Sequence, residues 1–178
     1  MEQLMLISIK TKYANQIFNG TKLYEYRRKS IGDKNCNKKI FIYSSGEEKA
    51  IVGYIIIEKI LEGDIDYILE ATNNKNNGDI IDYFNGCDKC YALKIASAIK
   101  FKTPIYLSEI KNIDKNFVVP QFYRYIKENE YIYEELKGRR GLWKHIIWNY
   151  FIILFFENHF KFIIYTLSLS SALKKGTI

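Results

Sequence analysis

The chain has 178 residues, enough for one domain with a short appendage, and its 48% hydrophobic and 26% charged residues are typical of a globular protein. Two prolines and ten glycines argue against long disordered linkers. The net charge of +7 favours an anionic partner, such as a nucleic acid, over a cationic one.

Hydrophobic periodicity predicts a series of short elements in the first part of the chain. They are a strand at 4–9, a helix at 12–19, and strands at 21–28, 39–43 and 50–61. We expect Thr11 to cap the helix and Gly20 to end it. Gly53 interrupts the longest strand, which predicts a bulge or a bend of the kind that a barrel corner needs.

The second part of the chain continues with two short helices before the next strand. The predicted elements are helices at 65–69 and 80–84, strands at 90–102 and 118–125, a short element from Pro104, and a helix at 126–137. Strands and helices do not alternate in this order. Several short strands with a glycine bend therefore predict an α+β domain, built on a small closed or half-closed barrel flanked by short helices.

Positive charge is concentrated near the start of the chain. Residues 1–40 contain nine Lys and Arg residues against three acids, and tyrosines stand between the cations. Such a pattern indicates a surface that meets a polyanion. The alternative is the ordinary solvated face of a lysine-rich protein.

The stretch 20–29 combines these features at close spacing. In a regular strand Glu25 and Arg27 share one face, where we expect them to pair, while Lys22 projects to the opposite face or lies at the strand entrance. Tyr24 and Tyr26 then lie on the face opposite Glu25. A surface salt bridge, contributing about 0–1 kcal/mol, is the structural alternative to a binding site.

The cysteines predict neither a disulfide framework nor a metal site. Cys87 and Cys90 have C-x2-C spacing, but a zinc site usually needs four ligands, and only His145 and His159 remain to complete one. Unpaired thiols are the favoured interpretation, and we expect no metal and no cofactor. An odd cysteine count and an N-terminus without signal-peptide character predict a cytoplasmic protein.

Several short motifs occur in an order that is similar to a known family. They are Ser8-Ile9-Lys10, Tyr13-Ala14, Gly20-x-Lys22-x-x-Glu25-x-Arg27, Ile42-Tyr43-Ser44-Ser45, Ile51-Val52-Gly53-Tyr54, Tyr91-Ala92-Leu93-Lys94 and Pro120-Gln121-Phe122. Over residues 5–125 the chain resembles the small prokaryotic branch of the ASCH domain family, which is related to PUA-like RNA-binding barrels. The resemblance implies a barrel of about six strands.

The resemblance also implies a cleft between the first helix and the barrel, where the family binds RNA or nucleotides. The residues expected to bind nucleic acid there are Lys10, Lys12, Tyr13, Lys22, Glu25, Arg27, Arg28, Tyr43 and Ser44. Tyrosine rings can stack a base, and the cations can hold phosphate. An RNA- or nucleotide-binding module is therefore the function that the sequence favours.

An enzyme is the first alternative. One ASCH branch is an amidohydrolase of acetylated cytidine that uses the motif lysine, which Lys22 matches, whereas Glu25 stands where that branch has threonine. Other members have been linked to ribonuclease activity. Lys22 and Glu25 are thus the catalytic candidates if the protein hydrolyses a modified nucleoside or RNA.

The end of the chain differs from the rest. Residues 146–156 hold a single polar side chain, and Glu157 and Lys161 interrupt the apolar run before it resumes at 162–169. A spanning helix needs about 20 apolar residues, so these charges oppose it. We expect an ASCH-like domain at 1–137 and a hydrophobic extension at 138–178. Residues 142–170 are candidates for a membrane surface, a protein partner or packing on the barrel.

Overall fold

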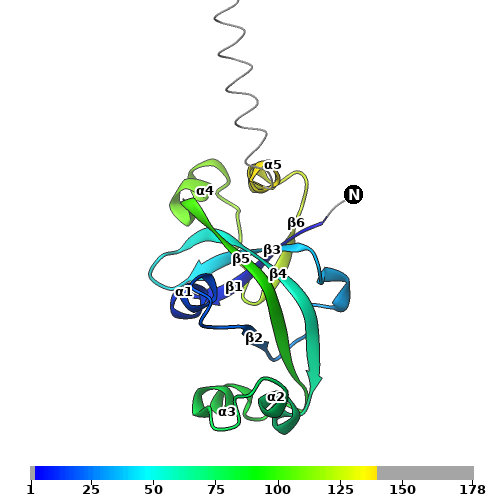
Figure 1. Ribbon diagram of the computed structural model, residues 1–178. Coiled ribbons are helices and arrows are strands. Elements are labelled where there is room, and N and C mark those ends of the chain that lie inside the picture. Colours follow the sequence, from blue (N-terminus) through cyan, green and yellow to red (C-terminus); the bar gives the residue numbers. More distant parts are fainter. Residues whose placement is uncertain (1–2, 140–178) are drawn as a thin grey trace, which may run out of the picture. The chain divides into compact units, whose positions relative to one another are not determined.

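The computed structural model describes residues 3–139. The elements are β1 (Leu4–Lys10), α1 (Thr11–Phe18), β2 (Tyr24–Arg27), η1 (Asp33–Asn35), β3 (Lys39–Ser45), β4 (Ala50–Gly63), α2 (Ile65–Ala71), α3 (Gly78–Phe84), β5 (Cys90–Tyr106), α4 (Leu107–Ile113), β6 (Tyr123–Ile126) and α5 (Tyr131–Gly138) (Figure 1). The chain divides into two units, Met1–Glu134 and Glu135–Ile178. The boundary expected after residue 137 stays a prediction.

The predicted roles of the hydrophobic extension lie outside the described residues. Both histidines and the segment 142–170, the candidate for a membrane or partner surface, belong to that part of the chain. Over residues 3–139, no helix has both the length and the apolar character needed to cross a bilayer.

The six strands form one mixed sheet in the order β2-β5-β4-β3-β1-β6. β1 pairs with β3 in parallel, and every other neighbouring pair is antiparallel. The α+β class and the number of strands predicted from the sequence are therefore confirmed. The hydrogen-bonded ladder has β2 and β6 at its two edges and does not close.

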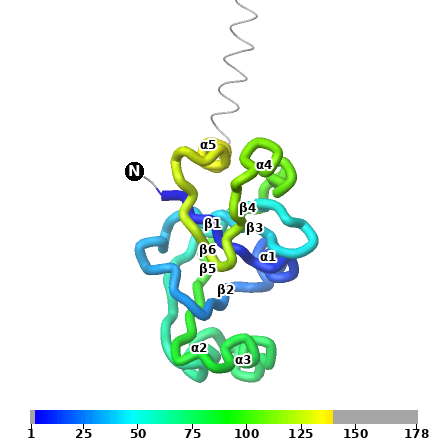
Figure 2. The backbone as a smooth tube through the Cα atoms, turned by 180° about the vertical axis from the view of Figure 1, so that it is seen from behind, coloured from blue at the N-terminus to red at the C-terminus, as the bar shows by residue number. Residues whose placement is uncertain are grey.

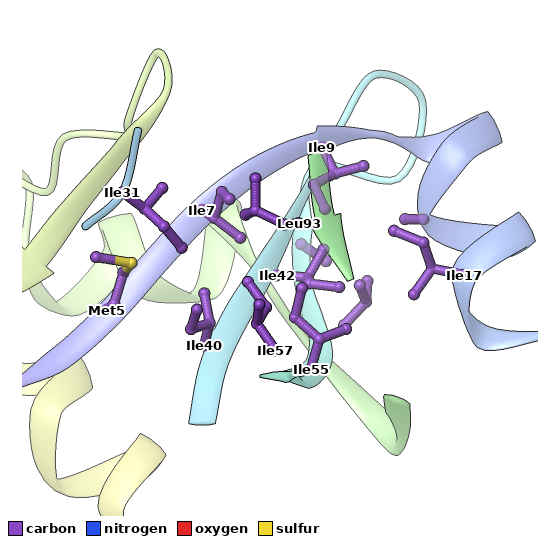
Figure 3. Packing of buried hydrophobic residues seen from close by; sticks show 13 residues of the cluster. Met5, Ile7, Ile9, Ile17, Ile31, Ile40, Ile42, Ile55, Ile57 and Leu93 are labelled. Atoms are coloured by element: carbon purple, nitrogen blue, oxygen red, sulfur yellow. The ribbon is translucent and has the colours of Figure 1, made fainter. Parts of the chain in front are cut away.

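The main hydrophobic core lies between the sheet and α1. β1 contributes Met5, Ile7 and Ile9 (Figure 3). α1 contributes Ala14 and Ile17, which are three residues apart and therefore lie on one face of the helix. Ile31, from the segment between β2 and η1, and residues of β3, β4 and β5 complete the cluster. The apolar run of β1 is buried because the strand lies between β3 and β6.

Gly53 of β4 permits a close approach that no side chain would allow. A Cβ atom at this position would lie 2.2 Å from the carbonyl oxygen of Ile99 and 2.8 Å from the ring of Phe18. The pairing register of β4 shifts beside this glycine on both of its neighbours. The predicted bulge is therefore confirmed, and it lets α1 pack closely on the β4–β5 pair.

The helices α2 and α3 form a small pair at the far end of the long β4–β5 ribbon (Figure 1). The side chain of Asp64 caps α2 by accepting a hydrogen bond from the backbone N–H of Tyr67, and Asn77 caps α3. Ile68 and Phe84 belong to a second hydrophobic cluster, which packs against β2 and β5. In both views β2 lies between α1 and this helical pair (Figure 2).

Several local predictions differ from the structure. The helix predicted at 126–137 is α5, Tyr131–Gly138, and Pro104 belongs to β5 rather than to a separate element. Thr11 does not cap α1: it is the first helical residue, and its hydroxyl accepts a hydrogen bond from Ser44. The strand predicted at 21–28 covers only Tyr24–Arg27, because Lys22 donates its backbone N–H to Gln16 at the end of α1. The last strand is Tyr123–Ile126 rather than 118–125, since only those residues pair with β1.

Candidate functional site

The side chains of Lys22, Glu25 and Arg27 meet at β2, and we call them the β2 cluster. The Lys22 Nζ contacts Glu25 Oε2, and the Arg27 Nη2 lies 3.1 Å from Glu25 Oε1. The expected pairing of Glu25 with Arg27 is confirmed. Lys22 was expected on the opposite face or at the strand entrance; it lies at the entrance, before the short strand, and its flexible side chain reaches the same carboxylate.

Glu25 and Arg27 of the β2 cluster are buried and Lys22 is half-buried, and the cluster carries one net positive charge, from two cations and one carboxylate. The exposed side-chain fractions are 15% for Lys22 and 8% each for Glu25 and Arg27. Both polar contacts of Arg27 are made through Nη2, and its Nε is buried without a hydrogen-bond partner among the described residues. Because Glu25 and Arg27 are buried, the interpretation of the pair as a surface salt bridge is wrong. Removing one charge from a buried pair is costly.

Arg27 is held in place from β1. Its Nη2 donates a hydrogen bond of 2.6 Å to the backbone carbonyl of Ser8. Ser8 is fixed in turn by its hydroxyl, which donates to the Pro120 carbonyl at 2.5 Å, and by its N–H, which donates to the Phe122 carbonyl at 2.9 Å. The segment before β6 thus braces the strand that positions the guanidinium.

Aromatic rings and further cations surround the β2 cluster. The ammonium of Lys22 lies 5.4 Å from the ring centroid of Tyr13 and 5.3 Å from that of Tyr26. Three other cations lie over rings of this region: Lys12 over Tyr13, Arg28 over Tyr83 and Lys29 over Phe122. We call Lys12, Arg28 and Lys29 the basic rim. All three are exposed, so their charge faces solvent.

Two tyrosines of this region have raised pKa values. Burial raises the pKa of Tyr26 above its ordinary value near 10.0, although a hydrogen bond with Thr72 acts in the opposite direction. Burial also raises the pKa of Tyr83, while the positive charge of Arg27 lowers it and the carboxylate of Glu25 raises it. Both phenols therefore remain protonated donors at neutral pH.

A second, shallower feature lies where β1 runs into α1. Lys10, Lys12 and Ser45 are among the residues that line an open groove of about 480 Å³, together with Glu47. Lys12 connects this groove with the β2 cluster, because Lys12 and Lys22 share the ring of Tyr13.

The described residues show no arrangement suited to metal binding. Over residues 3–139 no three His, Cys, Asp or Glu side chains lie close enough together to hold a metal ion. Cys36, Cys87 and Cys90 are free, and burial raises the pKa of the Cys90 thiol.

Comparison with known proteins identifies relatives of this fold and sequence. No family model matches the chain. An ASCH domain-containing ribonuclease from Zymomonas mobilis is 27% identical over 128 residues, which cover 70% of this chain and 85% of the relative. The crystal structure of ASCH from Zymomonas mobilis superposes with a TM-score of 0.62 at 27% identity, over 71% of this chain and 89% of that one.

A crystal structure of a mutant of the Zymomonas mobilis protein gives a TM-score of 0.65 at 26% identity, over 75% of this chain and 94% of the other. Sequence and fold agree. The chain is similar to the ASCH domain family in both. In this ASCH domain the motif residues Lys22, Glu25 and Arg27 converge on one buried cluster.

The other predicted site residues of the ASCH domain separate into three groups. Tyr13 lies beside the β2 cluster, Arg28 belongs to the basic rim, and Lys10 and Lys12 line the groove. Tyr43 is only 3% exposed, so the expectation that its ring stacks a base is wrong. Ser44 is fully buried, and its hydroxyl is occupied by Thr11.

Sequence reasoning missed two residues that complete this region. Tyr83 of α3 contacts Arg28, and the ring of Phe122 lies beneath the ammonium of Lys29. Tyr83 stands far from the motif in sequence, and the spacing of Ile80 and Phe84 pointed only to a buried helix face. Phe122 belongs to a matched motif, Pro120-Gln121-Phe122, which was the available signal.

Proposed function

We propose that this ASCH domain binds RNA, with the β2 cluster holding a backbone phosphate. The observation that carries the proposal is the unbalanced charge of that cluster: one buried and one half-buried cation share one buried carboxylate. An excess charge removed from water is costly unless a counter-charge accompanies it. A phosphate placed beside Lys22 and Arg27 supplies that counter-charge.

The chemistry of Arg27 supports an oxyanion as the ligand. A guanidinium presents five donors that match the oxygens of phosphate. Arg27 uses Nη2 for both of its polar contacts, and its buried Nε has no hydrogen-bond partner within the described part of the chain. Among the described residues, Arg27 therefore keeps one unsatisfied donor, its buried Nε, beside a surplus of positive charge.

The surroundings favour a nucleic acid over a free inorganic anion. Every cation of the basic rim lies over an aromatic ring, so charge and flat apolar surface alternate around the cluster. Single-stranded nucleic acid is bound by this combination of backbone-tracking cations and stacking rings. Lys10 and Lys12 extend the positive surface along the groove at α1.

Ribonuclease activity is the second candidate, and the name of the Zymomonas mobilis relative favours it. Lys22 and Glu25 would act on the phosphate or on a ribose hydroxyl. Both oxygens of Glu25 are already in contact with a cation, one with Lys22 and the other with Arg27. The geometry therefore supports binding more directly than acid–base chemistry. Hydrolysis of a modified nucleoside rests on the match of Lys22 alone.

Replacing Lys22 provides the cleanest test of phosphate binding. Lys22→Met removes the surplus charge and leaves the neutral Glu25–Arg27 pair. We expect the affinity for short single-stranded RNA to fall about tenfold, and the salt slope to decrease by about 0.7. Fluorescence anisotropy at two salt concentrations measures both quantities. Lys111→Gln is the matched control, because it removes an exposed charge from α4.

The result that contradicts the proposal is equally specific. If the wild-type chain binds neither single-stranded nor structured RNA, the domain does not act on RNA. If it binds but Lys22→Met and Lys111→Gln behave alike, the site lies elsewhere. Incubation of end-labelled RNA with saturating protein tests the ribonuclease candidate, which requires a cleavage product that Glu25→Gln no longer forms.

A further inference from the structure

We infer that Tyr83 and Arg28 form a base-binding subsite beside the β2 cluster. The inference rests on the proposed function and deepens it, because it assigns the recognition of an unpaired nucleobase to residues outside the family motif. Arg28 follows β2, and Tyr83 belongs to α3. The two residues come from segments 55 positions apart that the fold brings into contact.

The contact between Arg28 and Tyr83 fixes both side chains. The Arg28 Nε donates a hydrogen bond of 2.6 Å to the backbone carbonyl of Tyr83. The guanidinium carbon lies 5.2 Å from the centroid of the Tyr83 ring. One arginine is therefore held by the backbone and the ring of the same residue, which pre-orders a planar cation over an aromatic surface.

Tyr83 is also anchored to the aromatic residues that support Lys22. Its ring meets the buried ring of Phe84 edge-on at 5.1 Å, and Phe84 meets Tyr26 at 6.0 Å. The Lys22 ammonium lies over the same Tyr26 ring. Tyr83 and the β2 cluster thus share one packed support, so their separation is fixed by the fold.

The subsite lies within electrostatic reach of the proposed phosphate position. Although burial is the largest influence on the pKa of Tyr83, the charges of Arg27 and Glu25 also act on it. Arg28 directly follows Arg27 of the β2 cluster and contacts Tyr83, so a nucleotide whose phosphate lies at the cluster can bring its base to Tyr83 and Arg28. The chemistry requires a flat ring that is not already paired.

Tyr83 is more exposed than a tyrosine that serves only to fill the core. Tyr83 is 38% exposed and Arg28 is exposed, so surface remains for a ligand. Unpaired bases stack on aromatic rings and on guanidinium planes. Tyr67 of α2 is 48% exposed, but no cation lies over its ring within residues 3–139. Tyr67 therefore provides a matched control from the same helical pair.

The experiment compares two RNA probes with the full chain. One is a single strand of about eight nucleotides, and the other has the same backbone without bases. We expect Tyr83→Leu to weaken binding of the first probe about tenfold and to leave binding of the abasic probe unchanged. Tyr83→Phe keeps the ring and is expected to retain wild-type affinity, and Tyr67→Leu is expected to change neither measurement.

The outcomes distinguish this inference from the proposed function. If Lys22→Met weakens binding but Tyr83→Leu does not, the phosphate site stands and the base subsite is wrong. Equal loss for both probes in Tyr83→Leu also overturns the inference, because the ring would then act only by placing the charge of Arg28. If the wild-type chain binds neither probe, the proposed function itself fails. Urea unfolding of each variant shows whether the fold is retained.

Discussion

Two Arg–Glu pairs in this domain, Arg27–Glu25, which is buried, and Arg124–Glu130, which is half-buried, have different electrostatic environments. Arg124 contacts both oxygens of Glu130, at 2.8 and 2.6 Å, and its guanidinium lies over Phe117. Arg27 contacts Glu25 through one nitrogen at 3.1 Å. In both arginines the Nε is buried without a hydrogen-bond partner in the described residues, so this feature alone does not distinguish them.

The difference is the balance of charge around each carboxylate. Glu130 has one cationic partner and also accepts a hydrogen bond from the backbone N–H of Lys127 at 2.7 Å. Glu25 is shared between Arg27 and Lys22, so the β2 cluster keeps a surplus cation. The Arg124 pair is electrically neutral and structural, whereas the β2 cluster has unused capacity for an anion. The proposed binding site therefore rests on a surplus of charge and not on the presence of an ion pair as such.

The largest effect is expected from Glu25→Leu, which leaves buried Arg27 and half-buried Lys22 without a counter-charge. We expect the free energy of unfolding to fall by about 3–5 kcal/mol. Glu130→Leu leaves a single, less deeply buried cation, and we expect a loss of about 1–3 kcal/mol. Urea unfolding of both variants measures the difference.

Added anion sharpens this comparison. Sulfate at a fixed ionic strength should raise the melting temperature of Glu25→Leu more than that of Glu130→Leu, because only the first variant has two adjacent unpaired cations. Equal losses of stability, or equal rescue by sulfate, would show that the two pairs are equivalent and that the charge surplus has no functional meaning.

A smaller, pH-dependent effect is expected at Glu130. Burial by itself raises the pKa of this carboxyl, but hydrogen bonds from Arg124 and from the Lys127 backbone outweigh it and hold the pKa below the ordinary 4.5. A lowered pKa adds stability above the unfolded value, and this stability is lost as the pH falls through the folded pKa. Glu130→Gln should therefore cost most stability near neutral pH and progressively less below pH 4.5.

Thermal melts of wild type and Glu130→Gln from pH 7 to about 3 provide the measurement. The two melting curves should converge as the medium becomes acidic. A constant difference across this range would mean that Glu130 acts through packing rather than through its charge.

The sequence predicted what depends on local pattern. The apolar run of β1, the helix with Ala14 and Ile17 on one face, and the glycine-dependent bulge at Gly53 follow from periodicity and from backbone freedom. The pairing of Glu25 with Arg27 followed from the two-residue repeat of a strand. These features need no knowledge of the rest of the fold.

Features that depend on tertiary placement were missed. Tyr43 and Ser44 stand in an apparently accessible stretch, but β3 lies between β1 and β4, which buries both. Tyr83 reaches the site only because α3 packs on β2 through the cluster of Phe84 and Tyr26. Lys22 joins Glu25 because the chain leaves α1 in a loop rather than in an extended strand.

The smallest effect is expected at the exposed ion pairs, and it tests whether burial explains the contrast. Lys89 lies 2.7 Å from Glu62, a shorter contact than that between Arg27 and Glu25. Both partners are largely in solvent, with 66% and 48% of their side chains exposed. Water screens their attraction, and ordering two long side chains opposes it. Lys89→Gln should leave the urea midpoint and RNA affinity at wild-type values. A clear loss of stability would mean that contact distance, rather than burial and charge balance, separates these pairs from the β2 cluster.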